Sequence, residues 1–355
     1  MMARPLNSRE IDALPNILDV VERISVRENS LILPEVSRVP SSPYFDEGRY
    51  NFVSESHDRN IVRLMPTSQS PFTFYRGQSI FHDRCLPSLY RATPSRSEIA
   101  SNRIKTCEFV RLLCTHPVFN GVRRNLQVDY IALAQHYGLN TEYLDITNSK
   151  WVAAFFASTR YDQNTDTYSP VGREFHNGYG VMYISKDIVK CDLRDRFFER
   201  NGTIGYQYFE RPTKQSSFGY RMEAGEDFNE SPYFDKVLFR HDVDASTIVF
   251  NMSYRQNRFI PKDTLSKLAR QISSSSEVTR AALSMCREWF YPNEPTDFID
   301  DVCAGKKWRI REDNTPIVQF SQEELEEDWR SWNEFGREDL NSRILPIIPI
   351  AKIKI

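Results

Sequence analysis

Hydrophobic and polar residues alternate along this chain with a period that changes from segment to segment. Between residues 15 and 27, apolar side chains recur at helical spacing behind Pro15, a residue suited to a first turn, so the sequence predicts a short N-terminal helix there (Ile17, Leu18, Val21 and Ile24). Residues 30–43 are rich in proline and serine, which disfavours both a helix and a central strand. We expect that segment to be a linker or a surface strap.

The middle of the chain alternates between short strand-like and helix-like runs. Residues 72–75 alternate like a strand and stop at Arg76-Gly77, where glycine lets the backbone turn, so the pattern presents an arginine at a strand end. Asp129 is a suitable N-cap for a helix that ends at Gly138 and carries His136 in its last turn. The remaining expected elements are helices at 104–113 and 150–158, the second buried on most sides, and strands at 143–147, 180–184 and 247–250.

After residue 261 the pattern is helical. Three one-sided apolar stripes predict three helices, the last of which begins with the capping-box sequence Ser321-Gln322-Glu323-Glu324 and carries Trp329 and Trp332. We expect these helices to pack on the preceding domain or on a partner. The closing residues 350–355 alternate apolar and charged side chains, which predicts an edge strand. The predicted organisation is an N-terminal helix and strap (1–59), an α+β domain (60–258) and a helical C-terminal region (259–355).

The composition is that of a folded protein without a strong net charge. The 355 residues are 40% hydrophobic and 13% aromatic, and 46 basic side chains are balanced by 48 acidic ones. This balance excludes the general positive field that drives non-specific nucleic-acid binding. The six cysteines form no C-x-x-C pair, and no signal peptide or membrane-spanning run is present, so we expect free thiols, a cytoplasmic location and no membrane partner. The six histidines are also dispersed, and no metal site is expected.

One local cluster of basic residues lies before and within the segment around residue 211. The arginines and lysine are interleaved with aromatic side chains, a combination that holds single-stranded nucleic acid. Neighbouring acidic residues would instead make this a solvated, neutralised face, and this second interpretation is favoured. The basic residues of the cluster are Arg194, Arg196, Arg200, Arg211 and Lys214.

Common nucleotide and hydrolase motifs are absent from the sequence. Neither G-x-G-x-x-G nor G-x-x-x-x-G-K-[ST] occurs, which disfavours a Rossmann dehydrogenase and a P-loop ATPase. G-x-S-x-G is absent too, which removes the usual hydrolase elbow.

Three other blocks of sequence occur in a fixed order. The first is Phe74-Tyr75-Arg76-Gly77-Gln78; the second runs from Ala134-Gln135-His136-Tyr137-Gly138 through Thr147 to Ala157; the third is Arg211-Pro212-Thr213-Lys214-Gln215-Ser216-Ser217-Phe218. With these blocks the chain resembles the FRG domain family, named for a Phe-Arg-Gly motif, over residues from roughly 60 to 250. It departs from the family pattern at Tyr75, Glu142 and Ile146, and in the third block, where Q-x-G-x-F becomes Gln215-Ser216-Ser217-Phe218.

The FRG family is in turn similar to ADP-ribosyltransferases, and this resemblance implies a fold and a function. The implied fold is α+β, with an ADP-ribosyltransferase-like split β-sheet core and a helical C-terminal extension. The implied function is NAD-dependent mono-ADP-ribosyl transfer to a protein or nucleic-acid acceptor by a bacterial or phage-related toxin or defence effector, with an antitoxin or chaperone as a possible partner. NAD is then a substrate, bound by Arg76, Gly77, Tyr137, Thr147 and Phe156, and the catalytic residues are Gln215, His136 and Asp145.

The chemistry of NAD cleavage explains these roles. The planar fork of Arg76 suits a pyrophosphate, and positive charge developing on the ribose calls for a nearby carboxylate or carbonyl oxygen. Asp145 and Thr147 would orient the nicotinamide ribose, His136 would serve as a local acid or base, and Gln215 would polarise ribose hydroxyls without supplying a charge. Glu223, Glu210 or Asp145 would compensate for that missing charge. We therefore expect Arg76, Thr147 and Gln215 to converge on one cleft.

Each of these residues also has a purely structural interpretation. Arg76 could pair with Asp145 in the core, and His136 could be a satisfied buried histidine. Tyr137 and Phe156 could be packing residues, Thr147 a helix N-cap and Gln215 part of an ordinary polar loop. At the level of function, the alternatives are a non-catalytic nucleotide-sensing or partner-binding module and an NAD glycohydrolase that uses water as the acceptor. The acceptor itself is not fixed by the fold.

Overall fold

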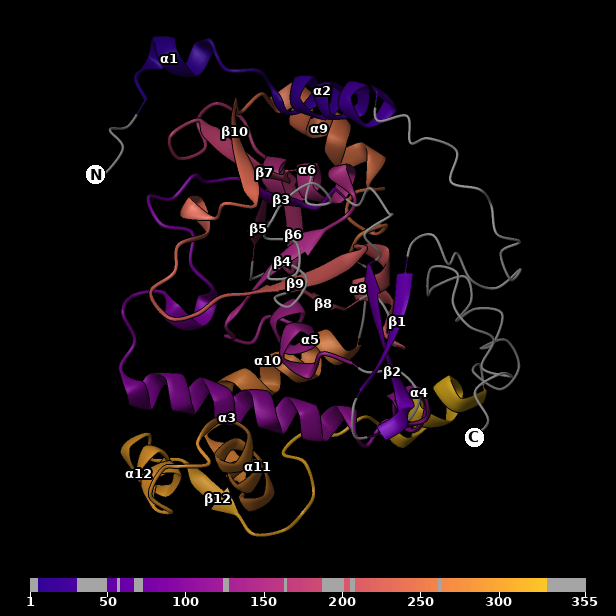
Figure 1. The fold of residues 1–355 in the computed structure, drawn as a ribbon, viewed down its shortest axis with the longest axis vertical. Coiled ribbons are helices and arrows are strands. Elements are labelled where there is room, and N and C mark those ends of the chain that lie inside the picture. The colour runs from indigo at the N-terminus through magenta and orange to yellow at the C-terminus, as the bar shows by residue number, and fades with distance from the viewer. Residues whose placement is uncertain are drawn as a thin grey trace.

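A six-stranded antiparallel sheet forms the centre of the fold (Figure 1). The computed structural model describes residues 6–30, 50–55, 58–66, 73–123, 128–162, 165–186, 201–204, 208–260 and 264–330. Neighbouring strands lie in the order β10 (Phe234–Arg240), β7 (Tyr179–Ser185), β3 (Tyr75–Gln78), β4 (Tyr143–Thr147), β9 (Ser217–Arg221) and β8 (Asn201–Thr203).

The sheet is nearly divided in two between β3 and β4. These strands are paired at one position, Tyr75 opposite Thr147, whereas β4 and β9 are paired along the whole length of both strands. β3 is fully paired with β7 on its other side, so β10, β7 and β3 form one half and β4, β9 and β8 the other. Beyond Tyr75 and Thr147 the two central strands separate, and an opening is created within the sheet.

One face of the sheet is covered by α6 (Lys150–Ser158), with α2 (Ile17–Ser30) and α9 (Val243–Met252) packed beside it (Figure 1). α6 lies unusually close to β3. A Cβ atom added to Gly77 would lie 1.8 Å from the carbonyl oxygen of Ala153 and 2.8 Å from Cβ of Ala157. Glycine is therefore required at residue 77 because any larger residue would push α6 away from the sheet.

The opposite side of the domain is built on α3 (Arg96–Leu113), the long helix in the lower part of Figure 1. α5 (Tyr130–His136) and α10 (Thr264–Ser274) pack on one side of it, and α11 (Arg280–Phe290) and α12 (Phe298–Gly305) on the other. Three polar side chains tie these layers together: Lys105 donates to the carbonyl oxygens of Ser275 and Glu277, and Glu108 accepts from Thr279. The C-terminal helices thus pack on the preceding domain, as their apolar stripes predict.

The remaining elements are short. α4 (Pro117–Arg123) follows α3, and α8 (Glu210–Lys214) precedes β9. The other elements are α1 (Ser8–Asp12), η1 (Ser88–Tyr90), η3 (Phe228–Glu230), the hairpins β1 (Tyr50–Glu55) with β2 (Asp58–Pro66) and β5 (Thr159–Asp162) with β6 (Thr167–Pro170), and the parallel pair β11 (Glu277–Thr279) with β12 (Arg309–Arg311).

Most of the expected elements are confirmed, and one is wrong. The strand at 143–147 and the helix at 150–158 have the predicted bounds, and Asp129 and Ser321 cap helices as expected. Residues 247–250 are not a strand but part of α9. The side chain of Asp242 accepts hydrogen bonds from the backbone N–H groups of Asp244 and Ala245, and this N-cap starts the helix. The helix packs on α6, and this packing outweighs the low helix propensity of its β-branched residues.

Two predicted boundaries are also corrected. β3 begins at Tyr75 and ends at Gln78, so Arg76 lies inside the strand and not at its end. α3 begins at Arg96 rather than near residue 104, because Ser95 and Glu98 form a capping box.

The remaining expectations concern the cysteine thiols, membrane-spanning helices and several segments that lie outside the described residues. The thiols of Cys85, Cys107, Cys286 and Cys303 are free, as expected. None of the helices in the described ranges combines the length and apolar character needed to cross a bilayer. The expected strap at 31–43, the basic residues at 194–200, Trp332 and the terminal strand at 350–355 lie outside the described residues.

Candidate functional site

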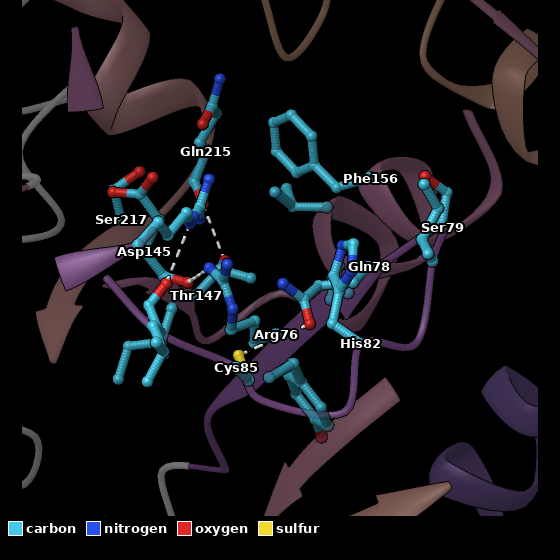
Figure 2. Close-up of a pocket in the computed structure, with 18 of the residues that line it drawn as sticks. Arg76, Gln78, Ser79, His82, Cys85, Asp145, Thr147, Phe156, Gln215 and Ser217 are labelled. Carbon is cyan, nitrogen blue, oxygen red and sulfur yellow. Dashed lines mark hydrogen bonds between the residues drawn. The ribbon is translucent and has the colours of Figure 1, made fainter. Parts of the chain in front are cut away.

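A cavity of about 590 Å³ lies where β3 and β4 separate (Figure 2). Its walls are β3, the loop at 79–92, the C-terminal half of β4, one face of α6, and residues 215 and 217. The volume is in the range of small-molecule binding sites. Arg76, Thr147 and Gln215 all line this cavity, so the predicted convergence of the three blocks is confirmed.

Arg76 retains free hydrogen-bonding capacity at this cavity. Its Nη1 donates to the main-chain carbonyl oxygen of Asp145 at 2.7 Å, and Figure 2 shows the guanidinium reaching across to β4. Its Nε is buried and has no hydrogen-bond partner in the described part of the chain. Arg76 does not form the suggested core ion pair with the Asp145 carboxylate, because its hydrogen bond goes to the main-chain oxygen of Asp145. The second terminal nitrogen, Nη2, has no partner in the described part of the chain and is not buried, so it stays available for an anion.

Asp145 supplies the one carboxylate among the described residues that line the cavity. Its Oδ1 lies 3.8 Å from Nδ1 of His136, and 41% of its side chain is exposed. Burial raises the pKa of Asp145, but the neighbouring His136 ring and the positive charges of Arg76 and Arg211 outweigh burial and bring that pKa below its ordinary value. The carboxylate is therefore negatively charged at neutral pH, and its Oδ1, the oxygen nearest His136, is buried without a hydrogen-bond partner in the described part of the chain.

His136 lies next to Asp145 but does not itself line the cavity. It is the last residue of α5, only 6% exposed, and its Nε2 is buried without a partner in the described part of the protein. The 3.8 Å contact between His136 and Asp145 is longer than a hydrogen bond, so the ring is a close neighbour of the carboxylate and not a bonded partner.

The rest of the Ala134–Gly138 block builds the frame around this pair. Gly138 has φ of +85°, which ends α5 in the left-handed conformation that glycine adopts freely. Gln135 Oε1 accepts hydrogen bonds from Oγ of Ser88 and Oγ1 of Thr141, each at 3.0 Å. This side chain therefore ties the loop at 79–92, through η1, to the segment that leads into β4.

Thr147 and Gln215 are bonded to each other. Oγ1 of Thr147 donates to the main-chain oxygen of Gln215 at 2.7 Å and accepts from the N–H of Ser149, the N-cap of α6, at 3.0 Å. The Thr147 hydroxyl is thus occupied in fixing the third block against β4. Gln215 Nε2 donates to the carbonyl oxygen of Phe259 at 2.8 Å, whereas its amide oxygen has no donor in the described part of the chain.

The two aromatic candidates, Tyr137 and Phe156, have different surroundings. Tyr137 is 5% exposed, packs against Phe109 and Phe209, and does not line the cavity, so its surroundings are those of a core residue. Phe156 is half-buried and lines the cavity from α6, with its ring edge-on to Phe155. Phe156 is placed where a flat heterocycle could lie against it.

Of the carboxylates suggested to compensate for Gln215, Asp145 is the one that lines the cavity. Glu223 belongs to the turn after β9, where its N–H donates to Glu226. The side chain of Glu210 lies outside the described part of the chain.

The loop at 79–92 adds cavity residues that lie outside the three motif blocks, and the polar ones are Ser79, His82, Arg84, Cys85 and Arg91. This loop follows the Arg-Gly motif but has no periodic pattern of its own. The available signal was the gathering of three basic side chains between Gly77 and Ser95. The loop comes back to the sheet through a hydrogen bond from Leu89 N–H to the carbonyl oxygen of Thr141, a contact between residues distant in sequence.

Comparison with known proteins gives one match. No curated protein and no solved structure shows a significant similarity to the chain. Residues 72–166 match the family model described as the FRG domain. This segment contains β3, the loop at 79–92, β4 and α6, and it contributes every described lining residue of the cavity except Gln215 and Ser217. The match supports the FRG domain family for residues 72–166, and so for most of the cavity wall.

Proposed function

We propose that the chain is an NAD-dependent mono-ADP-ribosyltransferase whose active site is the cavity between β3 and β4. The observation that carries this proposal is the meeting of three residues in one cavity: Arg76 with its guanidinium, Asp145 with its ionised carboxylate and Gln215 with its side-chain amide. These are the groups that a pyrophosphate, a developing positive charge and ribose hydroxyls call for, respectively. The near-division of the sheet at Tyr75 and Thr147 is compatible with the split-sheet core of ADP-ribosyltransferases.

Each residue has a distinct part in the proposed reaction. Arg76 binds the pyrophosphate of NAD, and Phe156 offers a surface to the nicotinamide ring. The bond between the ribose C1′ and the nicotinamide nitrogen breaks, the electron pair leaves with nicotinamide, and C1′ becomes oxocarbenium-like. Asp145 stabilises that positive charge with its carboxylate, and Gln215 accepts from a ribose hydroxyl through its amide oxygen. The acceptor nucleophile then attacks C1′ and loses its proton to Asp145 or to solvent.

His136 and Thr147 act as positioning residues in this scheme. His136 lies 3.8 Å from Asp145 and favours the charged carboxylate. Thr147 holds the backbone of Gln215 in place, and the carbonyl of Phe259 takes up the amide nitrogen of Gln215 so that the amide oxygen stays free. The charge needed by the transition state is thereby assigned to Asp145 rather than to Gln215.

A second candidate is a non-catalytic nucleotide-binding module. It is favoured by one observation: no glutamate is found among the described lining residues of the cavity. NAD glycohydrolase activity is intermediate between the two candidates, since the same site would then cleave NAD but transfer the ADP-ribosyl group to water.

One experiment separates these functions. Purified protein is incubated with NAD labelled in the adenylate phosphate and with a cell lysate, and label is then measured on protein, on nucleic acid and in free products. A transferase labels a macromolecule. A glycohydrolase releases free ADP-ribose and nicotinamide without labelling one, and a binding module leaves NAD intact.

Asp145→Asn tests the assigned residue. The change removes the charge and keeps the shape of the side chain, and we expect NAD cleavage to fall about 100-fold or more, since loss of one electrostatic contact at a transition state costs on that order. Asp83→Asn is the matched control, because Asp83 is an exposed aspartate of the neighbouring loop that does not line the cavity. Equal activity of Asp145→Asn and wild type would remove Asp145 from the mechanism.

A further inference from the structure

The loop at 79–92 gives the cavity an excess of positive charge on one side. Three arginines, Arg76, Arg84 and Arg91, line the cavity, and among the described lining residues Asp145 is the one acid. Figure 2 shows His82 and Gln78, which belong to β3 and the loop after it, across the cavity from Asp145 and Gln215. A wall of this kind repels cations and attracts anions.

The two loop arginines differ in their partners. Arg84 is turned toward the turn after β9: its Nε lies 3.7 Å from Oδ2 of Asp227, and its Nη2 donates to the carbonyl oxygen of Gly225 at 3.3 Å. Arg91 donates from Nε to the carbonyl oxygen of Leu86 at 3.1 Å, and its terminal nitrogens have no partner in the described part of the chain. The guanidinium of Arg84 therefore has an acidic partner and a carbonyl partner, whereas the terminal nitrogens of Arg91 have neither in the described part of the chain.

Arg91, Arg76 and His82 influence one another electrostatically. The pKa of Arg91 is lowered from its ordinary value by burial first and then by the positive charge of Arg76, against smaller opposing effects of Cys85 and Asp145. The pKa of His82 is lowered by burial and by the charges of Arg91, His176 and Arg76, against a smaller opposing effect of Asp83. The positive charges of Arg76 and Arg91 repel each other, and a bound anion would relieve this repulsion.

The backbone next to Arg91 is held in an uncommon conformation. Ala92 and Thr93 have φ of 56° and 47°, the left-handed region that β-branched residues such as threonine rarely adopt. Both ends of this turn are fixed, on one side by η1, where Thr141 N–H donates to Oγ of Ser88, and on the other by the capping box of Ser95. The turn thus keeps Arg91 on the wall of the cavity.

We propose that Arg91 is the second arginine of a diphosphate-binding site, and that Arg76 and Arg91 hold the diphosphate of a nucleotide between them. The inference rests on the proposed function in taking the ligand to be a dinucleotide. Two guanidinium groups offer two separate forks, one for each phosphoryl group. Arg84 also lines the cavity but is not assigned to this site, because its guanidinium is already directed to Asp227 and to the carbonyl oxygen of Gly225.

The test measures binding of ADP, inorganic pyrophosphate and adenosine by titration calorimetry with the full chain. Arg91→Gln is expected to weaken ADP and pyrophosphate binding about 10- to 100-fold, because it removes one charge-assisted contact, and to leave adenosine binding unchanged. Arg84→Gln removes the same charge from the same loop and is expected to leave ADP binding within about twofold of wild type. Matching circular dichroism spectra and melting temperatures show that the variants are folded.

A second measurement locates the bound diphosphate. Saturation with ADP adds negative charge near His82 and should raise the pKa of that ring in wild type, as followed by NMR titration. Absence of this rise would place ADP elsewhere and overturn the inference.

Other outcomes are equally decisive. Equal losses of ADP affinity in Arg91→Gln and Arg84→Gln, or no ADP binding by wild type, would overturn the diphosphate site. Binding of ADP that depends on Arg91, together with NAD that stays intact in the lysate experiment, would overturn the transferase proposal and leave the diphosphate site standing.

Discussion

Gly77→Ala is predicted to destabilise the protein through a steric clash between β3 and α6. The new Cβ would lie 1.8 Å from the carbonyl oxygen of Ala153, whereas a carbon and an oxygen in contact are about 3.3 Å apart, so α6 must move by roughly 1.5 Å. Overpacking of this kind usually costs about 1–3 kcal/mol, and here the obstacle is backbone rather than a flexible side chain. We therefore expect a loss of about 3 kcal/mol in the free energy of unfolding.

Two glycines provide matched controls for Gly77→Ala. Gly138→Ala places a Cβ in open space but at φ of +85°, and should cost about 1–2 kcal/mol through backbone strain alone. Gly305→Ala meets no atom within 4 Å and has no positive φ, so we expect little change or a slight gain. Urea unfolding followed by tryptophan fluorescence gives all three values. A Gly77→Ala variant as stable as Gly305→Ala would refute the steric reasoning.

Three further predictions follow from other parts of the structure. If the protein consumes NAD as a toxin, its expression should slow bacterial growth, and Arg76→Ala should abolish this toxicity. Arg76→Lys should keep only part of the toxicity, since an ammonium cannot form the bidentate contact of a guanidinium. Equal toxicity of folded Arg76→Ala and wild type would exclude ADP-ribosyl transfer as the cause. Burial lowers the pKa of Lys105 to about 8, below its value in the unfolded chain, so the unfolded state binds more protons between about pH 8 and 10.5. Over that window the unfolding free energy of wild type, relative to Lys105→Met, should rise with pH by about 2–3 kcal/mol, and parallel profiles of the two proteins would contradict the assigned burial. Deletion of residues 261–355 should give an insoluble product, because it uncovers the face of α3 formed by Ala100, Ile104 and Cys107; a soluble, cooperatively unfolding fragment would show that this face does not need its cover.

Local sequence signals were sufficient where a segment sets its own conformation. Asp129 caps α5 and Gly138 ends it in the left-handed region, and both effects act within a few residues. The bounds of β4 and α6 were also predictable, because alternation and capping change abruptly between Thr147 and Ser149. The same reasoning gave a strand for residues 247–250, where the cap at Asp242 and packing on α6 outweighed β-branched composition.

The candidate site was predictable only in part, because the direction of a side chain depends on residues distant in sequence. The resemblance singled out Arg76, Asp145, Thr147 and Gln215, and all four line one cavity. It gave no indication that Thr147 would bond to the backbone of Gln215, or that Tyr137 would face the core instead of the cavity. Such roles depend on which way a side chain points, and that is set by neighbours far away in sequence.

The sequence by itself determined the capped helices, the central strands and the residues that carry charge, because these depend on propensities and spacing within a few residues. Only the tertiary structure decided that β3 and β4 meet at Tyr75 and Thr147 and then separate, which opens the cavity. It also decided that the loop carrying Arg91 turns back to line that cavity, through the bonds of η1 to Gln135 and Thr141. The physical reason is that strand pairing and loop anchoring join residues distant in sequence, and their free energy exists only once the whole chain has packed.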